Sequence, residues 1–338
     1  MLTYLARRLG TMLMTLFVIS IISFVIIQLP PGDFVSNLTN RMANAGATNL
    51  PPGFEEMVRE RYGLNQPLYV QYTKWMGNIL LHGDFGYSFD YQRPASEVIA
   101  DRMPLTVLIA FVSLMFTWII ALPVGIYSAV RKYSIGDYIF TFLGFIGLAV
   151  PSFLLALVAM YIGITYFDTA LVGLFSPEFE HAPWSLARVG DLLLHLWIPV
   201  LIIGLAGTAS LIRVMRANLL DELSRPYVDT ARAKGMSERD LLLKYPVRSA
   251  LNPFISTLTW TLPALVSGEA IVAIVLNLPT TGPVLLQALM VQDMYLAAGF
   301  ILLLSALTVV GSWDEVAELV LSGAHSRTRT LVTRGAAR

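Results

Sequence analysis

The sequence predicts an all-α membrane protein that crosses the bilayer as six helices, with both termini on the cytoplasmic side. The 338 residues are 56% hydrophobic and only 14% charged, whereas soluble proteins carry about 25% charged residues. Uncharged runs long enough to cross the hydrocarbon core as a helix recur along the chain. Lysine and arginine gather in alternate connections between these runs, as the positive-inside rule requires.

The expected spans comprise residues 9–29, 104–130, 138–167, 192–212, 254–278 and 294–313. The first has more uncharged residues than the core of a cleavable signal peptide, so we expect it to stay as an anchor. The fifth contains one carboxylate, Glu269. The stretch 279–293 is too short to cross and is interrupted by Pro279, Gly282 and Pro283, so we expect a loop or a re-entrant turn there.

Positive charge orients the spans. Basic residues precede the first span, follow the second and fourth, and close the chain, which places these four regions in the cytoplasm. The long segment between spans one and two then lies outside, with a short helix at 54–61 ended by a turn at 62–67. The resulting organisation is a cytoplasmic N-terminus (1–8), a first span (9–29), an external segment (30–103), a transmembrane domain (104–312) with a cytoplasmic loop at 213–248, and a cytoplasmic tail (313–338).

Composition excludes several functions. A net charge of zero argues against a nucleic-acid partner. The chain has no cysteine, and its four histidines are scattered, so we expect no metal site. No phosphate-binding loop and no cluster of nucleophile and base occurs, so we expect no catalytic residues, and any energy must come from another protein.

The spans contain few ionisable groups. Glu269 is nearly alone, and it either faces a cavity or partner, or lies close to the outer interface and is solvated there. A stand-alone ion-coupled carrier or channel is therefore weakly supported by these residues. Prolines and glycines inside the spans, including Pro151, Gly125 and Gly204, predict kinked helices in close contact.

The polar stretch after span four predicts two short helices, at 226–233 and 237–244, separated by a break at Gly235. Ser237 and Asp240 have the spacing of a capping box. From the residues alone, this segment could also lie on anionic lipid as an amphipathic surface helix pair. Its expected apolar contact surface consists of Tyr227, Val228, Ala231, Met236, Leu241 and Leu242.

This stretch resembles the EAA loop of permease subunits of ATP-binding cassette importers. Asp229, Thr230 and Ala231 fill its acidic-small-Ala triplet, and Gly235 follows four positions after the last of these. In that family the loop forms the coupling helix that docks in a cleft of the nucleotide-binding subunit. The resemblance thus implies an ATPase-coupling site comprising Tyr227, Asp229, Thr230, Ala231, Lys234 and Gly235.

Motifs in a fixed order extend the resemblance over about residues 1–311. Together they are similar to the B-type subunit of the dipeptide/oligopeptide/nickel permease family. The motifs are Leu29-Pro30-Pro31-Gly32-Asp33, Tyr62-Gly63-Leu64-Asn65-Gln66-Pro67-Leu68, Gly83-Asp84-Phe85-Gly86-Tyr87-Ser88, Leu122-Pro123-Val124-Gly125 and Pro151-Ser152-Phe153.

The resemblance implies a type I importer permease fold in the bacterial inner membrane. It implies four partners besides lipid: a second, homologous permease, two ATP-binding subunits and an external solute-binding protein. ATP and magnesium would belong to the partners, with no cofactor on this chain. Peptides are the default cargo, and opines, oligosaccharides and nickel are the alternatives.

Family resemblance also suggests a pathway and an external turn, each with a departure. Pro151, Glu269 and Ala273 are the pathway candidates, and Ala273 stands where relatives place a carboxylate. Glu269, one turn away on the same helical face, is expected to replace that charge. The external turn is assigned to Pro279, Gly282 and Asp293, and its Pro-Thr-Thr-Gly lacks one family glycine. The tail after Gly311 departs from the family pattern as well.

Overall fold

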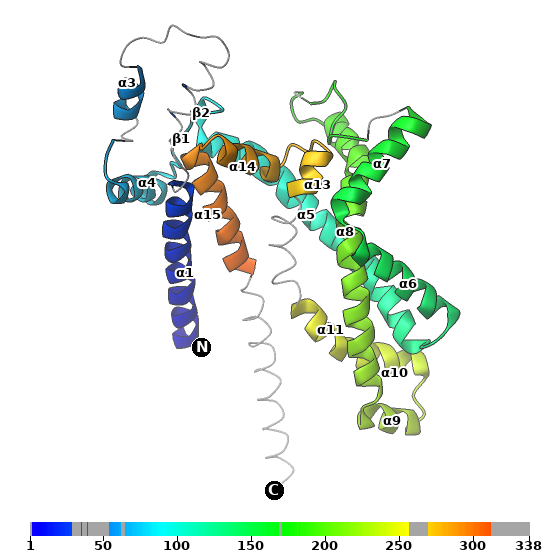
Figure 1. Ribbon diagram of the computed structural model, residues 1–338. Helices are drawn as coiled ribbons and strands as arrows, with labels where there is room; N and C mark the ends of the chain where they lie inside the picture. The colour runs from blue at the N-terminus through cyan, green and yellow to red at the C-terminus, as the bar shows by residue number, and fades with distance from the viewer. Residues whose placement is uncertain are drawn as a thin grey trace. The chain divides into compact units, whose positions relative to one another are not determined.

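The computed structural model describes residues 2–28, 35, 39, 54–61, 65–168, 171–180, 182–256 and 270–311. The chain divides into two compact units, one made of Met1–Thr106 and Pro279–Val309 and the other of Val107–Leu278 and Val310–Arg338. The described residues of both units are mainly helical (Figure 1).

The first unit is built around one apolar core. Its elements are α1 (Leu2–Gln28), α3 (Phe54–Arg61), α4 (Leu68–His82), the antiparallel strands β1 (Tyr87–Ser88) and β2 (Arg93–Pro94), the start of α5 (Ala95–Val130), α14 (Thr281–Met290) and α15 (Met294–Gly311). The core joins side chains from α1, α4, α5, α14 and α15. Trp75 of α4 stacks on Phe24 of α1 at 5.8 Å between ring centroids, and its indole nitrogen donates to the carbonyl of Phe85. Burial of these large aromatic surfaces supplies much of the stability.

The second unit is organised around one long helix, α8 (Leu186–Leu223) (Figure 1). The others are the remainder of α5, α6 (Ile135–Ala149), α7 (Ser152–Phe167), α9 (Pro226–Ala233), α10 (Glu238–Lys244), α11 (Pro246–Ser256) and α13 (Ala270–Val275). Helices α6, α7, α11 and α13 all pack against α8. A buried apolar cluster joins α5, α8 and α11 through Ala121, Ala129, Leu211, Met215, Leu219, Val247 and Ala250.

Two glycines let α5 approach α8 closely. A Cβ atom at Gly125 would lie 2.7 Å from the Cβ of Met215 and 3.1 Å from the carbonyl oxygen of Ile212. A Cβ at Gly204 would lie 2.5 Å from the Phe116 ring. Small residues at such contacts are typical of helices packed in membranes, and the predicted close contacts at these two positions are confirmed.

Helices α5 and α8 are long and apolar enough to cross a membrane, and α6 with α7 meets the same criteria if the two form one span. These two helices meet at 96°, so the prediction of one merely kinked helix at 138–167 is wrong. The cause is Pro151, which disfavours helical geometry in the preceding residue. Val150 is accordingly extended, with φ −90° and ψ 120°, and Pro151 is the N-cap of α7.

Other predictions fare differently. The short helix at 54–61 is confirmed as α3. Of the two alternatives expected at 279–293, a loop or a re-entrant turn, the plain loop is wrong, because most of the stretch is helical in α14. Pro283 falls in the first turn of this helix, where a missing N–H costs little. Helix α8 is longer at both ends than the span predicted at 192–212. The fifth expected span lies largely outside the described residues, so the count of six and the orientation stay predictions.

Candidate functional site

The polar segment after α8 folds into a compact helical hairpin, here called the knob (residues 226–244) (Figure 1). Helix α9 has the predicted bounds, Pro226–Ala233, and α10 runs over Glu238–Lys244 with Ser237 as its N-cap. The Ser237 hydroxyl accepts from the Asp240 amide at 3.2 Å and donates to the Asp240 carboxylate at 2.6 Å. The predicted helices and their cap are therefore confirmed.

The interior of the knob is apolar. Val228 of α9 and Leu241 of α10 are both completely buried, and α10 packs against α9 and α11. The prediction that these two side chains are available as a contact surface is wrong, because each turns inward to join the helices. Tyr227 is 38% exposed and is the most accessible large apolar side chain of the six proposed.

Gly235 sets the angle between the two helices. Its φ is +77°, a left-handed conformation that other residues adopt only at a cost. No neighbouring atom lies within 4 Å of the position that a Cβ would take, so backbone conformation, rather than space, requires glycine here. The predicted break at this residue is confirmed.

A clamp of charged side chains spans this turn. Arg232 of α9 donates to both carboxylate oxygens of Glu238 in α10, at 2.6 and 3.2 Å, and contacts Asp229 at 3.3 Å. The hydrogen bonds from Arg232 lower the pKa of Glu238, and those same bonds raise the pKa of Arg232. A bidentate arginine fixes orientation more strictly than a point charge does. The clamp and Gly235 together hold the two helices at one angle.

Tyr227 ties the knob to the end of α8. Its hydroxyl donates to the carboxylate of Glu222 at 2.6 Å, and its ring lies 6.5 Å from that of Tyr245. Burial, followed by this hydrogen bond, raises the pKa of Tyr227 to about 12. The knob is thus anchored at the residues that precede and follow it.

The outer surface of the knob is polar and carries both signs of charge. Five of the six residues predicted for this site are exposed, namely Tyr227, Asp229, Thr230, Lys234 and Gly235, and Ala231 is half-buried. Sequence reasoning missed Arg232 and Glu238, although an acid six residues after an arginine, across a glycine break, is a readable signal. The exposed charged side chains of the knob are Asp229, Arg232, Lys234, Glu238, Arg239, Asp240 and Lys244.

The predicted pathway residues do not form a described cluster. Pro151 is exposed at the bend between α6 and α7. Ala273 is buried in α13, which packs against α7 and α8. Glu269 lies outside the described residues, so its expected replacement of a family carboxylate stays a prediction.

The residues predicted to form the external turn lie in two places: Pro279 and Gly282 at the start of α14, and Asp293 as the cap of α15. Pro279 and Gly282 are half-buried at the beginning of α14. Asp293 is completely buried, and it accepts from the Ser88 hydroxyl at 2.6 Å and the Asp90 amide at 3.1 Å. It also accepts from the Leu296 amide at 3.4 Å, so it caps α15 and holds the β1–β2 hairpin. Burial raises the pKa of Asp293.

Sequence comparison identifies the family. Residues 1–110 match the N-terminal region of the binding-protein-dependent transport system membrane component, and residues 121–313 match the binding-protein-dependent transport system inner membrane component. The chain belongs to the binding-protein-dependent transport permeases. It is a permease subunit of an ATP-binding cassette importer and a multi-pass protein of the bacterial inner membrane. As a member of this family it is a transport permease rather than an enzyme.

Curated relatives match this permease over nearly its whole length. The oligopeptide transport system permease protein AppB of Bacillus subtilis is 34% identical, over 92% of this chain and 95% of the relative. A putative peptide permease of Brucella ovis is 32% identical over 92% and 94%. The glutathione transport system permease protein GsiC of Escherichia coli K12 is 31% identical over 90% and 92%.

Among solved structures, the inward-facing MetNI methionine ABC transporter is similar to this permease. The TM-score is 0.46 at 19% sequence identity, and the match covers 64% of this chain and 92% of the other. Binding-protein-dependent permeases work with a solute-binding protein and ATPases, so the function of the permease depends on surfaces that meet such partners.

Proposed function

We propose that the knob is the surface through which the ATPase subunits drive this permease. The observation that carries this proposal is the construction of the knob: an exposed polar surface on two helices whose angle is held by Gly235, the Arg232–Glu238 clamp and a buried apolar interior. A rigid helical projection transmits a push that a flexible loop would absorb. Its position at the end of α8, the central helix of the unit, gives such a push a path into the membrane helices.

The complete transporter would contain a second, homologous permease, two ATP-binding subunits that carry ATP and magnesium, and an external solute-binding protein. The chain itself would cross the membrane six times with both termini in the cytoplasm. The distribution of lysine and arginine supports this orientation, in which the knob would face the cytoplasm, where the ATPases would bind.

Peptides or peptide-like compounds are the proposed cargo. The names of the relatives support this class: two are named as permeases of an oligopeptide and a glutathione transport system, and one as a putative peptide permease. Opines, oligosaccharides and nickel are the other cargoes considered, and a ligand identified in the cognate binding protein would decide among them.

Co-purification tests the role of the knob. The tagged permease, expressed with its partner subunits, is expected to retain the ATPases. Gly235→Pro is expected to release them, because proline cannot adopt a φ of +77°. Lys234→Glu, which reverses an exposed charge of the knob, is expected to weaken their retention more at low salt than at high salt.

Lys74→Glu is the matched control, since Lys74 is also an exposed lysine and lies on α4 in the expected external segment. It should leave ATPase retention unchanged. Full retention by the Gly235→Pro and Lys234→Glu variants would contradict the assignment of the knob as the docking surface. Absence of ATPases from the parent complex would contradict the proposed assembly itself.

A further inference from the structure

A partly buried ion pair joins α6 to α8 near the knob. Asp137 lies in the first turn of α6 and is 2% exposed. Arg216 of α8 donates to both oxygens of this carboxylate, through Nε at 3.0 Å and Nη2 at 2.9 Å. This is the bidentate arrangement that gives an arginine pair its geometric strictness.

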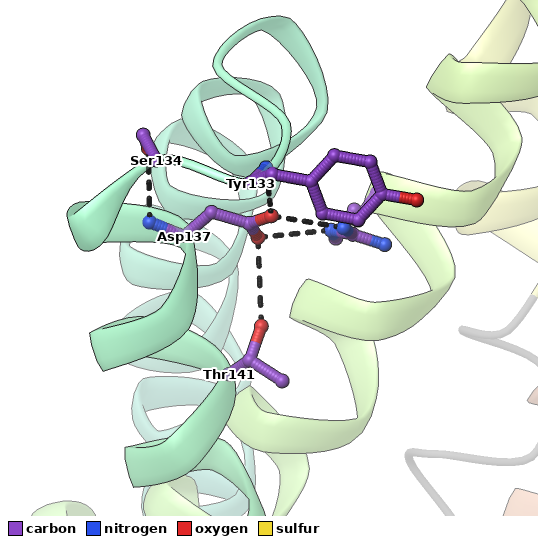
Figure 2. Close-up of polar contacts among 5 residues, drawn as sticks. Tyr133, Ser134, Asp137 and Thr141 are labelled. Carbon is purple, nitrogen blue, oxygen red and sulfur yellow. Dashed lines mark hydrogen bonds and ion pairs between the residues drawn. The ribbon is translucent and has the colours of Figure 1, made fainter.

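Local groups complete the coordination of the carboxylate, as Figure 2 shows. The Tyr133 amide donates to it at 2.9 Å and the Thr141 hydroxyl at 3.5 Å, while Ser134 caps the helix by accepting from the Asp137 amide. Tyr133 adopts a φ of +64°, which is costly for a tyrosine and persists only where its surroundings hold it. The α5–α6 turn is therefore built around the position of Asp137.

Beyond the ion pair, the packing of α6 against α8 includes close approaches at small residues and one cation–π contact. A Cβ at Gly144 or Gly147 would lie 3.9 or 3.6 Å from the Cβ of Ala209, and the Arg213 guanidinium lies 5.3 Å from the Phe145 ring. The two helices are antiparallel: Asp137 near the start of α6 meets Arg216, whereas Gly144 and Gly147 further along α6 lie beside Ala209, which is earlier in α8. The pair is thus a bidentate polar contact at one end of the packing between α6 and α8.

The ion pair is close to the knob along a continuous helix. Arg216 lies seven residues before the end of α8 at Leu223, which at the helical rise is about 10 Å. Such an ion pair contributes little net stability compared with packed apolar residues, whereas its bidentate geometry restricts the relative position of the two groups. The pair therefore lies where a displacement of α8 that begins at the knob could be passed on to α6.

We infer that Asp137 and Arg216 are positioning residues that keep α6 fastened to α8, so that displacement of the knob moves α6 together with α8. This inference rests on the proposed role of the knob. Without the pair, α8 would shift while α6 slid along the small residues at Ala209, and part of the motion would be lost. The bend at Pro151 then passes the displacement of α6 to α7.

The test compares Asp137→Asn with the parent in the complete transporter, reconstituted with its ATPases and purified binding protein. Asparagine keeps the shape of the side chain but removes the charge. The expected result is full retention of the ATPases and unchanged basal ATP hydrolysis. The stimulation of hydrolysis by the binding protein should fall by about tenfold, within the range typical of energetic coupling between two sites. This ratio does not depend on the amount of folded protein.

Asp168→Asn is the matched control, because it makes the same chemical change at an exposed position after α7. The φ of Asp168 is +50°, a conformation that asparagine tolerates, so stimulation should be unchanged. If the Asp137→Asn variant does not assemble, Arg216→Lys replaces it. Lysine keeps the charge but not the bidentate geometry, and it should also reduce stimulation.

A reversible disulfide cross-link tests directly whether stimulation requires α6 to be held against α8. The natural chain has no cysteine, and the 3.9 Å between Cβ positions at Gly144 and Ala209 suits a disulfide. Gly144→Cys with Ala209→Cys fastens α6 to α8 covalently. Oxidation should restore stimulation to the Asp137→Asn or Arg216→Lys variant, and reduction with dithiothreitol should remove it again.

Several outcomes would overturn the inference. One is normal stimulation in Asp137→Asn, or in Arg216→Lys where the former fails to assemble. Another is loss of stimulation when the cross-link is formed in the parent, since α6 would then have to leave α8 during the cycle. A cross-link that forms in the variant without restoring stimulation would do the same. Loss of the ATPases from the parent complex would instead contradict the proposed function.

Discussion

Substitution of Gly235 isolates the cost of the turn inside the knob. Because a Cβ at this position meets no atom within 4 Å, Gly235→Ala adds no clash and changes only the backbone preference at φ +77°. The left-handed conformation costs an alanine about 1–2 kcal/mol, which corresponds to roughly a 5- to 30-fold change in an equilibrium constant. Asparagine tolerates this conformation better, and proline cannot adopt it. The expected order of knob integrity is therefore Gly, Asn, Ala and Pro.

Two measurements locate this cost. The affinity of the ATPase subunits for the permease in nanodiscs reports whether the knob keeps its shape. If the knob keeps its shape, the cost remains as backbone strain, which thermal unfolding of the isolated permease reports as a lower melting temperature. If the clamp holds the alanine variant in the native geometry, most of the cost appears as lower stability. If the turn relaxes, it appears as up to about 30-fold weaker ATPase binding.

Gly77→Ala is the control, since Gly77 lies within α4 and also has no atom within 4 Å of its Cβ position. Helical geometry favours alanine by up to about 1 kcal/mol, so this change should be neutral or stabilising. The reasoning is refuted if Gly235→Ala matches the parent in both measurements, or if Gly235→Asn is more damaging than Gly235→Ala.

Three further predictions concern packing, pH and anchoring. Gly125→Ala should lower the melting temperature, because overpacking against Met215 costs about 1–3 kcal/mol. Gly190→Ala on α8 is the control and should not lower it, because no atom lies within 4 Å of the added Cβ. For Asp293, the raised folded pKa means that its contribution to stability is present below the unfolded pKa and is lost as pH rises through the folded pKa. The melting-temperature difference between the parent and Asp293→Asn should therefore shrink as pH rises. Tyr227→Phe should reduce stability by up to about 1 kcal/mol in chemical denaturation at neutral pH, and the difference should vanish as pH rises through about 12, where the parent hydroxyl ionises.

The parts of the fold that the sequence predicts well depend on local signals. Pro226 at the first position of α9, the glycine break and the serine cap of α10 each act within one helical turn, so the bounds of the knob helices could be read directly. Pro151 correctly predicted a change of helix direction, but the size of the bend was underestimated. It interrupts an apolar run that satisfies the length of one span, and only the extended conformation of Val150 reveals two helices at 96°.

The interactions that the sequence does not predict join residues far apart in the chain. Asp137 and Arg216 are 79 positions apart, and Ser88 and Asp293 are 205 positions apart, so no periodicity or spacing connects them. Asp293 was assigned to an external turn, yet it is a buried cap, because its neighbours along the chain say nothing about the hairpin that covers it. Burial of a carboxylate requires such distant partners to satisfy its oxygens.

These distant contacts show why the knob cannot be understood as a loop motif alone. Its foundation includes Leu219 and Met215 of α8, which belong to the same buried cluster as Val247 and Ala250 of α11. A force on the knob therefore reaches a helix pair that is already packed together, and α6 is added to that body by the fastening at Asp137. Close packing permits little independent movement of its members, so small displacements are passed on rather than absorbed. If the knob is the ATPase-coupling surface, as proposed, coupling depends on the knob and its buried foundation together.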